Sequence, residues 1–324
     1  MATMRIEGVS SSAERPVQVA VCVITYQRPQ GLRRLLDGLN RLTFAGAPPD
    51  VRCIVVDNDE AGSARAVCDE AGSEFRWKLE YSIEPRRGIP QARNAALAQA
   101  GTSADFVAFI DDDEVPEPTW LGELLRVQRE SGADVVAGPQ VPHFMEPPPR
   151  WIVKGRFFDP PPYRTGRRLD RASTGNVLIR ANVLRTMEQP FDARMALTGG
   201  EDIHFFRRVH RAGFSIVWTN EAVAYEWIPP SRVNAGWILR RAFRYGTNTA
   251  AIERDLRSPV GATLVLLALG CYKLAKGLFF LPPMTCLRGR AGAVFYAWLI
   301  WAGAGVLAGL AGHPYEEYRR VHGD

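Results

Sequence analysis

Segments typical of strands and of helices alternate through residues 17–138, and this alternation limits the fold more than any other feature of the sequence. The runs VQVAVCVITY, VRCIVVDND, WKLEYSIE and DFVAFIDDD are typical of strands. Between them lie PQGLRRLLDGLNRL, SARAVCDEAG and IPQARNAALAQAG, whose leucine spacing or closing glycine is typical of helices. Such alternation predicts an α/β fold with a mixed, mainly parallel, Rossmann-like sheet flanked by helices.

The C-terminal region, residues 258–324, has a different composition. Residues 291–312 carry no charge and reach the roughly 20 apolar residues that a helix needs to span a bilayer. Residues 259–283 are also apolar but contain Lys273 and Lys276, so they either span with the lysines extended to the surface or lie in the interface. A buried helical pair is the alternative. We expect C-terminal apolar, membrane-associated helices, with the number of spans left open.

The rest of the chain divides into a tail and one large domain. Residues 1–16 lack the apolar core of a signal peptide and form the expected N-terminal tail. Residues 17–257 form the expected globular domain, with halves of about 17–138 and 139–257. The second half opens with a proline-rich segment, residues 139–168, which we interpret as a functional loop because it is long for an ordinary connection.

Four carboxylates, residues 111–114, follow the strand-like run VAFI. Adjacent carboxylates repel one another, so a folded chain either solvates them or neutralises them with a cation. Ligands of α/β sheets bind beyond the carboxyl ends of the strands. Asp57 ends an earlier strand, and we expect it to face the same crevice as the acidic cluster. Carboxylates together with substrate phosphates suit Mg²⁺ or Mn²⁺. The alternative is an acidic turn that is exposed to solvent and binds no ligand.

The net charge of +5 favours an anionic partner or surface. Nucleic acid is an unlikely match, because the basic residues adjoin the apolar C-terminal region and the predicted crevice is acidic. Five cysteines without CxxC spacing fit a reducing compartment. We therefore expect a membrane partner and no nucleic acid.

Six motifs in order carry a family resemblance: VCVITYQRP, VVDND, GIPQARNAAL, FIDDDEVPEPTWL, TGNVLIR and GGEDIHFFRRVHRAG. Together they resemble the family 2 glycosyltransferases with the glycosyltransferase A fold, and within them the bacterial exopolysaccharide, succinoglycan-type enzymes. The resemblance covers roughly residues 17–257. It implies an inverting transfer from a nucleotide sugar, usually a uridine diphosphate sugar, without a covalent intermediate.

The resemblance gives the acidic cluster the role of a DxD motif. Asp111 maps to the first acid, at the ribose and the metal, and Asp113 to the last acid, at the metal. Asp112 is the middle residue, which we group with the nucleotide-sugar site. The implied Mg²⁺ or Mn²⁺ neutralises the diphosphate leaving group.

The resemblance also implies a nucleotide site at other strand ends. Asp57 resembles the aspartate that accepts a hydrogen bond from uracil, although a strand-end turn is the alternative use of such a residue. Thr25 and Tyr26 are implied to line the base and ribose. Arg93 and Asn94 match a pattern close to the nucleotide, and an exposed helix face is their alternative.

The ED pair of the family maps to Glu201 and Asp202. We predict that Asp202 is the general base that takes the proton of the acceptor hydroxyl, with capping of a helix from Ile203 as the alternative. On weaker grounds, Gly175, Asn176 and the stacking residue Trp151 are assigned to the acceptor side.

These features predict an inverting, metal-dependent glycosyltransferase of the inner membrane with its catalytic domain in the cytoplasm. The QxxRW motif of processive relatives is missing from the sequence, which favours addition of one sugar. The expected acceptor is a lipid-linked oligosaccharide or another envelope or exopolysaccharide glycan. Two alternatives stay open: the same fold acting on a glycolipid or protein, and a degenerate scaffold that binds nucleotide sugars without turnover.

Overall fold

The computed structural model describes residues 15–315. The strands are β1 (Gln18–Thr25), β2 (Asp50–Asp57), β3 (Lys78–Ile83), β4 (Phe106–Ile110), β5 (Glu114–Pro116), β6 (Val135–Ala137), β7 (Gln140–Phe144), β8 (Arg168–Leu169), β9 (Asn176–Arg180), β10 (Ile216–Trp218) and β11 (Ala224–Ile228). The helices are α1 (Pro29–Asn40), α2 (Arg65–Gly72), α3 (Ile89–Ala100), α4 (Trp120–Ser131), α5 (Arg150–Gly155), α6 (Ala181–Arg185), α7 (Glu201–Arg211), α8 (Ala235–Leu256) and α9 (Pro259–Leu310), with 3₁₀ turns η1 (Ala193–Met195) and η2 (Pro230–Arg232). Most of the expected tail, residues 1–16, lies outside the described residues.

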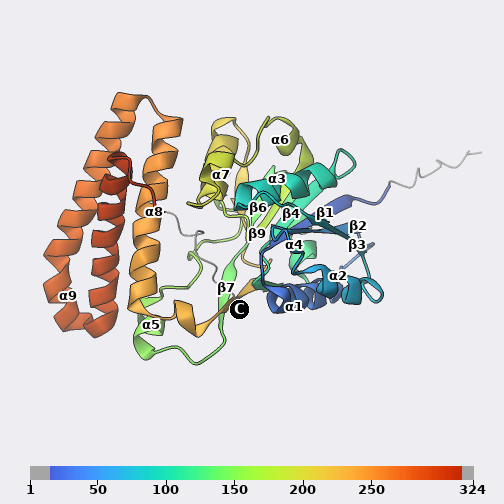
Figure 1. Cartoon of the computed structure of the whole chain (residues 1–324), viewed down its shortest axis with the longest axis horizontal. Helices are drawn as coiled ribbons and strands as arrows, with labels where there is room; N and C mark the ends of the chain where they lie inside the picture. Colours follow the sequence, from blue (N-terminus) through green and yellow to red (C-terminus); the bar gives the residue numbers. More distant parts are fainter. Residues whose placement is uncertain (1–14, 316–324) are drawn as a thin grey trace, which may run out of the picture.

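The main sheet has the order β3-β2-β1-β4-β9-β6-β10-β8. The strands β3, β2, β1 and β4 run parallel, as their alternation with helices predicts. β9 lies antiparallel between β4 and β6, and β8 pairs antiparallel with β10 at the sheet edge. The mixed, mainly parallel sheet predicted from the sequence is therefore confirmed (Figure 1).

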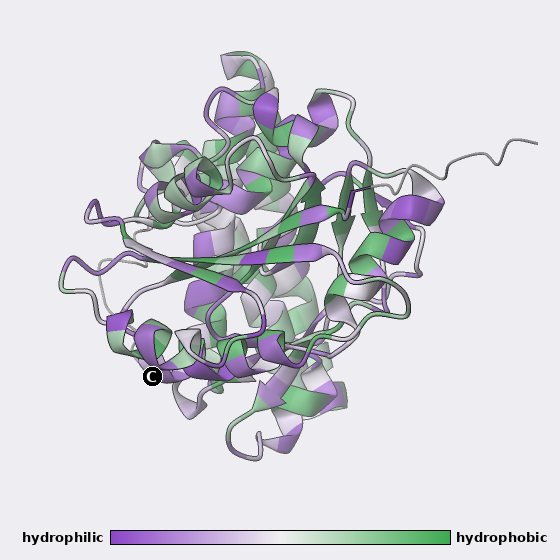
Figure 2. Cartoon of the chain, turned by 90° about the vertical axis from the view of Figure 1, so that its right-hand side faces the viewer, coloured by the Kyte–Doolittle hydropathy of each residue, from purple (hydrophilic) through white to green (hydrophobic). Residues whose placement is uncertain are grey.

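Both faces of this sheet are buried, because alternate side chains of each strand point to opposite faces. Val19, Val21 and Val23 of β1 pack with the leucines of α1 and α4. Ala20 and Cys22 of the same strand pack on the other face with the alanines of α3 and the phenylalanines of α7. Figure 2 shows the hydrophobic strands in green between helices whose outer faces are purple. Burial on both faces explains why these strands are continuous apolar runs.

A second sheet, with the order β5-β11-β7, lies beside the acidic cluster. β11 runs antiparallel to β5 and parallel to β7, and Glu226 of β11 pairs in register with Glu114 of β5. The proline-rich segment 139–168 is thus not simply a loop, since it contributes β7, α5 and the first residue of β8. These elements are short, and Pro142 lies inside β7, so the period that identifies longer strands is lost.

The C-terminal region forms a helical layer on the left of Figure 1. α9 reverses at Gly289, whose φ of 59° is non-helical, so residues 259–288 and 290–310 form two arms that pack against each other. Glycines allow close contact with α8: a Cβ at Gly246 would lie 2.6 Å from the Val306 amide nitrogen. α9 is long and apolar enough to cross a membrane, and only 17% of its most apolar window is buried. The expectation of apolar C-terminal helices is met, and α9 is a candidate membrane anchor.

Candidate functional site

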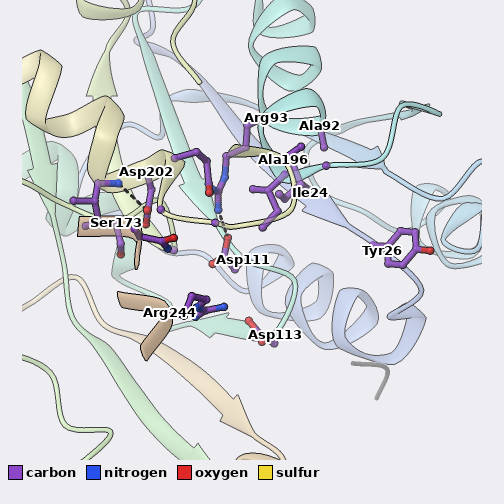
Figure 3. A pocket seen from close by; sticks show the side chains of 18 of the residues that line it. Ile24, Tyr26, Ala92, Arg93, Asp111, Asp113, Ser173, Ala196, Asp202 and Arg244 are labelled. Carbon is purple, nitrogen blue, oxygen red and sulfur yellow. Dashed lines mark hydrogen bonds and ion pairs between the residues drawn. The ribbon is translucent and has the colours of Figure 1, made fainter. Parts of the chain in front are cut away.

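A cavity of about 650 Å³ opens where β1 and β4 end, between the sheet and α8. Four parts of the chain contribute the side chains on which the chemistry depends (Figure 3). They are the β1 end (Thr25, Tyr26, Arg28), the β4 end (Asp111, Asp112, Asp113), the start of α7 (Glu201, Asp202), and the wall formed by β11, η2 and α8 (Glu226, Arg232, Trp237, Arg241, Arg244, Tyr245). Its position at the carboxyl ends of parallel strands is typical of ligand sites in α/β folds.

The turn after β4 is held by neighbouring elements. Thr25 Oγ1 donates to Asp112 at 2.8 Å, and Arg28 Nη1 donates to Asp112 at 3.0 Å and to Asp113 at 3.3 Å. Burial nevertheless raises the pKa of Asp112 to about 6. Gly31 lets α1 approach this turn, since a Cβ there would lie 2.6 Å from the Asp112 carbonyl oxygen. Asp112 therefore anchors the turn, while Asp111 and Asp113 present their carboxylates to the cavity.

A buried arginine connects the β4 turn to the start of α7. Arg93 Nη2 lies 3.2 Å from Asp111, and Arg93 Nη1 forms an ion pair with Glu201. Burial raises the pKa of Glu201 to about 7, in spite of the neighbouring arginine. Asp202 lines the cavity one residue later and is partly exposed. Glu201 is thus a buried link to Arg93, whereas Asp202 is the carboxylate that a ligand can reach.

Asp202 does not cap α7. The helix begins at Glu201, and its N-cap is Gly200, whose φ of 88° suits glycine. Asp202 lies in the first turn, where its Oδ1 accepts from the Ile203 amide at 2.7 Å. The alternative reading of a helix starting at Ile203 with Asp202 as its cap is therefore wrong.

Two further carboxylates crowd the turn. Glu114 is buried and bonded to Gln140, and burial together with Asp111 and Asp113 raises its pKa well above the usual range. Glu226 lines the cavity, and burial and then Asp113 raise its pKa. This concentration of like charge favours binding of a cation.

The carboxylates fit a divalent cation that is shared with a substrate. Within residues 15–315, no group of three or more His, Cys, Asp and Glu side chains could hold a metal ion by itself. Asp111 and Asp113 both face the cavity, and Mg²⁺ is commonly bound by one or two carboxylates together with substrate phosphates. We therefore take these two residues as the fitting donor set.

Tyr26, on the β1 side of the cavity, faces Arg87. The guanidinium of Arg87 lies 5.0 Å from the centre of the Tyr26 ring. Asn58 also lines the cavity and accepts from the Gly88 amide at 2.7 Å through its Oδ1 atom. An aromatic ring beside a guanidinium suits the stacking of a planar base. Thr25 is mainly engaged with Asp112, so Tyr26 is the more accessible of the two predicted residues.

Two of the predicted nucleotide residues do not line the cavity. Asp57 is fully buried and accepts hydrogen bonds from the amides of Asp59 (3.0 Å) and Ala64 (2.7 Å) and from the Tyr81 hydroxyl (3.1 Å). Asp57 therefore does not face the acidic crevice as predicted, because its side chain stabilises the turn after β2, and its contact with a base stays a prediction.

Asn94 is also structural. Its Nδ2 donates to the Phe191 carbonyl at 2.7 Å, and its Oδ1 accepts from the Phe191 amide at 3.2 Å. These two bonds tie α3 to the chain before η1. The assignment of Asn94 to the nucleotide site stays a prediction that these bonds do not support, while its neighbour Arg93 lines the cavity.

Two of the three residues assigned to the acceptor side lie away from the cavity, and their assignment stays a prediction. Asn176 is buried, accepts from Trp120 Nε1 at 2.7 Å and donates to the carbonyls of Pro139 and Ala222, so it joins β9 to the second sheet. Trp151 packs in an apolar cluster of α5, α8 and α9, with the Arg290 guanidinium 4.7 Å from its ring centre. Neither residue lines the cavity. Gly175 does, and it packs against Gln140 and Glu114 so closely that no Cβ would fit.

Several cavity residues were given no role from the sequence. Arg232 Nη1 lies 3.1 Å from Asp113 and 3.2 Å from Glu226, and so bridges the two sheets. Glu226, in the run AYEW, lies far along the sequence from the acids of the β4 turn. Its pairing with Glu114 across β11 and β5 brings it to the cavity. Arg28 lies inside the first motif, VCVITYQRP, and that position was the available signal.

Comparison with known proteins identifies the family. Residues 20–189 match the sequence model of glycosyl transferase family 2. The chain is 32% identical to the succinoglycan biosynthesis protein ExoM of Rhizobium meliloti (strain 1021) over 302 residues, which cover 91% of this chain and 93% of that protein. The chain belongs to glycosyl transferase family 2. The transferase is also 24% identical to the glycosyltransferase AglE of Haloferax volcanii over 70% of its length and 71% of that protein.

Solved structures show the same fold at low sequence identity. The transferase resembles S. aureus TarS 1–349, solved with UDP-GlcNAc, with a TM-score of 0.54, 16% identity and coverage of 93% of both chains. It also resembles the mannosyltransferase PcManGT from Pyrobaculum calidifontis, solved with GDP-Man and Mn²⁺, with a TM-score of 0.57, 18% identity and coverage of 94% of this chain and 77% of that one. The glycosyltransferase A fold expected for the transferase is therefore confirmed.

Proposed function

We propose that the transferase is an inverting enzyme that moves one sugar from a nucleotide diphosphate sugar to a lipid-linked oligosaccharide or another envelope or exopolysaccharide acceptor. The observation that carries the proposal is one cavity lined by Asp111 and Asp113 from the β4 turn and by Asp202 from α7. A uridine nucleotide is our choice of donor, in line with the ligand in the TarS structure. The similarity to ExoM, a succinoglycan biosynthesis protein, supports an exopolysaccharide-type acceptor.

In the proposed reaction the acceptor hydroxyl oxygen attacks the anomeric carbon of the donor. Its bond to that carbon forms as the bond from the carbon to the diphosphate oxygen breaks, and the nucleoside diphosphate leaves with the electron pair. Asp202 takes the hydroxyl proton, as a general base within hydrogen-bond reach would. Attack from the face opposite the leaving group inverts the anomeric configuration.

The remaining residues position the donor. Tyr26 and Arg87 flank the base, and Arg93 holds Asp111 and Glu201 in fixed relation. Asp111 and Asp113 would hold Mg²⁺ or Mn²⁺, which would neutralise charge on the diphosphate when bound. Arg28 and Arg232 limit the repulsion between Asp113 and its acidic neighbours.

We further propose that α9 anchors the enzyme to the inner membrane with the catalytic domain, residues 17–257, in the cytoplasm. The length, apolar composition and low burial of α9 support this proposal.

A panel of nucleotide sugars tests the donor assignment. Each sugar is added with Mn²⁺ to the purified full-length protein, and hydrolysis and the shift in melting temperature are measured. We expect one nucleotide sugar to raise the melting temperature and to be slowly hydrolysed. A panel in which no nucleotide sugar does either would contradict the proposed function.

A further inference from the structure

We propose that Arg241 and Arg244 of α8 bind a phosphate group of the acceptor, and that this acceptor is a lipid-linked saccharide whose reacting sugar lies near its phosphate. The inference rests on the proposed function, because it names the acceptor class of the same cavity. It assigns a site on the wall opposite the strand ends.

Both arginines line the cavity that contains Asp202, and Figure 3 draws Arg244 among the lining side chains. Arg241 is held in place by aromatic neighbours. Its Nε donates to the Tyr245 hydroxyl at 2.6 Å, and its guanidinium lies 5.0 Å from the centre of the Trp237 ring. Arg244 lies 5.8 Å from the Tyr245 ring centre. Such packing orders a guanidinium before a ligand arrives, and arginine binds phosphate through paired hydrogen bonds.

Charge separates this wall from the donor side. The β4 turn and the start of α7 present Asp111, Asp113 and Asp202, which repel an anion unless a cation intervenes. α8 presents guanidinium groups and aromatic rings instead, and Arg241 also interacts with the charge of Glu226 on the same wall. α8 lies between the α/β domain and α9 in Figure 1, and so on the far side of the cavity from β1 and β4. An anionic group of the acceptor is therefore complementary in charge to α8, whereas a neutral sugar alone would leave the charge of two guanidinium groups unneutralised.

The neighbouring helix indicates the source of the phosphate. α8 packs along α9 through glycines, among them Gly305, which lies against the Phe243 backbone. α9 exposes large apolar side chains, including Leu264, Leu278 and Phe279, whose exposed fractions are 64%, 61% and 73%. A phosphate on α8 would thus lie beside a surface suited to lipid. A polyprenyl-type carrier presents a phosphate at the membrane surface with an apolar chain below it, and arginines near a membrane attract such groups.

The size of the cavity limits the acceptor. Asp202 and both arginines share one cavity of about 650 Å³ that also receives the donor sugar. If the phosphate of the acceptor lies at α8, the attacking hydroxyl at Asp202 belongs to a sugar close to that phosphate. The inferred acceptor is therefore a short lipid-linked saccharide and not the distal end of a long one.

The test measures binding of farnesyl diphosphate to the full-length protein in detergent, by calorimetry, with Mg²⁺ and saturating UDP so that the donor site is filled. Four proteins are compared: the wild type, the double variant Arg241→Gln/Arg244→Gln, the double variant Arg241→Lys/Arg244→Lys, and the control Arg240→Gln. Arg240 lies on the same helix but is exposed and does not line the cavity. Inorganic pyrophosphate and farnesol are the matched probes.

We expect farnesyl diphosphate to bind the wild type, with affinity reduced at least tenfold in the glutamine double variant, partly restored by lysine and unchanged by Arg240→Gln. Pyrophosphate and farnesol should each bind at least tenfold more weakly than farnesyl diphosphate. Equal affinity of the wild type and the glutamine double variant, an equal loss in Arg240→Gln, or no binding to the wild type would overturn the proposal. Pyrophosphate that binds as tightly as farnesyl diphosphate would overturn the inference that the phosphate belongs to a lipid.

UDP binding to the same proteins separates this inference from the proposed function. We expect the glutamine double variant to bind UDP as the wild type does, which also shows that it is folded. If its UDP affinity falls together with that for farnesyl diphosphate, the arginines serve the donor and the inference fails. If the wild type binds neither UDP nor any other nucleoside diphosphate, the proposed function itself fails.

Discussion

Replacing Asp202 with asparagine should separate donor binding from turnover. The amide retains the Oδ1 atom that accepts from the Ile203 amide at 2.7 Å, and the helix keeps its Gly200 cap. The local structure should therefore survive. The amide cannot take a proton, and loss of a general base typically lowers rates by about 10²- to 10⁴-fold. At 1.36 kcal/mol for each factor of ten, this is a rise of about 3 to 5 kcal/mol in the activation free energy.

The cost in stability should be much smaller. Removing one negative charge from the first turn of a helix typically costs about 0.3 to 1 kcal/mol. Glu123 provides a matched control, because it is also acidic, lies in the first turn of α4 and does not line the cavity. Glu123→Gln should lose a similar small stability and no activity.

The assay compares release of nucleoside diphosphate in the presence of lipid-linked acceptor with donor binding by calorimetry and unfolding by heat. We expect Asp202→Asn to bind donor within about twofold of the wild type and to turn over roughly a thousandfold more slowly. Turnover comparable to that of the wild type would remove Asp202 from the mechanism and direct attention to Glu201. Loss of donor binding as well would place Asp202 in the donor site and refute the separation of roles.

Three further predictions follow from the site. Chelation by EDTA should weaken donor binding, and Asp113→Ala should remove the dependence on the cation with most of the affinity; equal calorimetric affinity with and without EDTA would contradict the metal role. Asn176→Ala should lower the free energy of unfolding by about 3 kcal/mol or more, because Trp120 Nε1 and two carbonyls lose their buried partner, while the folded fraction still binds donor with unchanged affinity in a denaturant titration. Burial raises the pKa of Glu201 to about 7, so the folded state binds more protons than the unfolded state between about pH 4.5 and pH 7. The free energy of unfolding of the wild type should fall relative to that of Glu201→Gln as the pH rises through that range, by at most about 3 kcal/mol. A difference between the two proteins that stays constant from pH 5 to pH 8 would rule this out.

The sequence was sufficient for the parallel part of the sheet, because β1, β2 and β4 are largely apolar runs separated by helical patterns. It was also sufficient to expect carboxylates after β4 and at the start of α7, since adjacent charges at the ends of apolar elements are informative by themselves. It did not predict the second sheet. β5 and β11 are short, and their pairing depends on contacts between residues more than a hundred positions apart, such as Glu114 and Glu226.

Single polar residues were the hardest to place from the sequence. An aspartate after a strand can either meet a ligand or stabilise a turn, and both uses give the same local sequence. The Asp57 carboxylate accepts hydrogen bonds from the amides of Asp59 and Ala64, and the Asn176 side chain is bonded to Trp120 and two carbonyls. These partners are set by the tertiary structure and leave no periodic signal. The boundaries of the tail, the catalytic domain and the C-terminal region stay predictions.

The stereochemistry of the transferred sugar tests the account most directly. The full-length protein is incubated with the nucleotide sugar that it binds and with lipid-linked saccharides extracted from bacterial membranes. The mass of the lipid product and the configuration at its new anomeric carbon are then measured by mass spectrometry and NMR. The account predicts a lipid product heavier by one sugar, with the configuration inverted relative to the donor. Retention of configuration, or donor binding without any transfer to the extracted lipids, would contradict it.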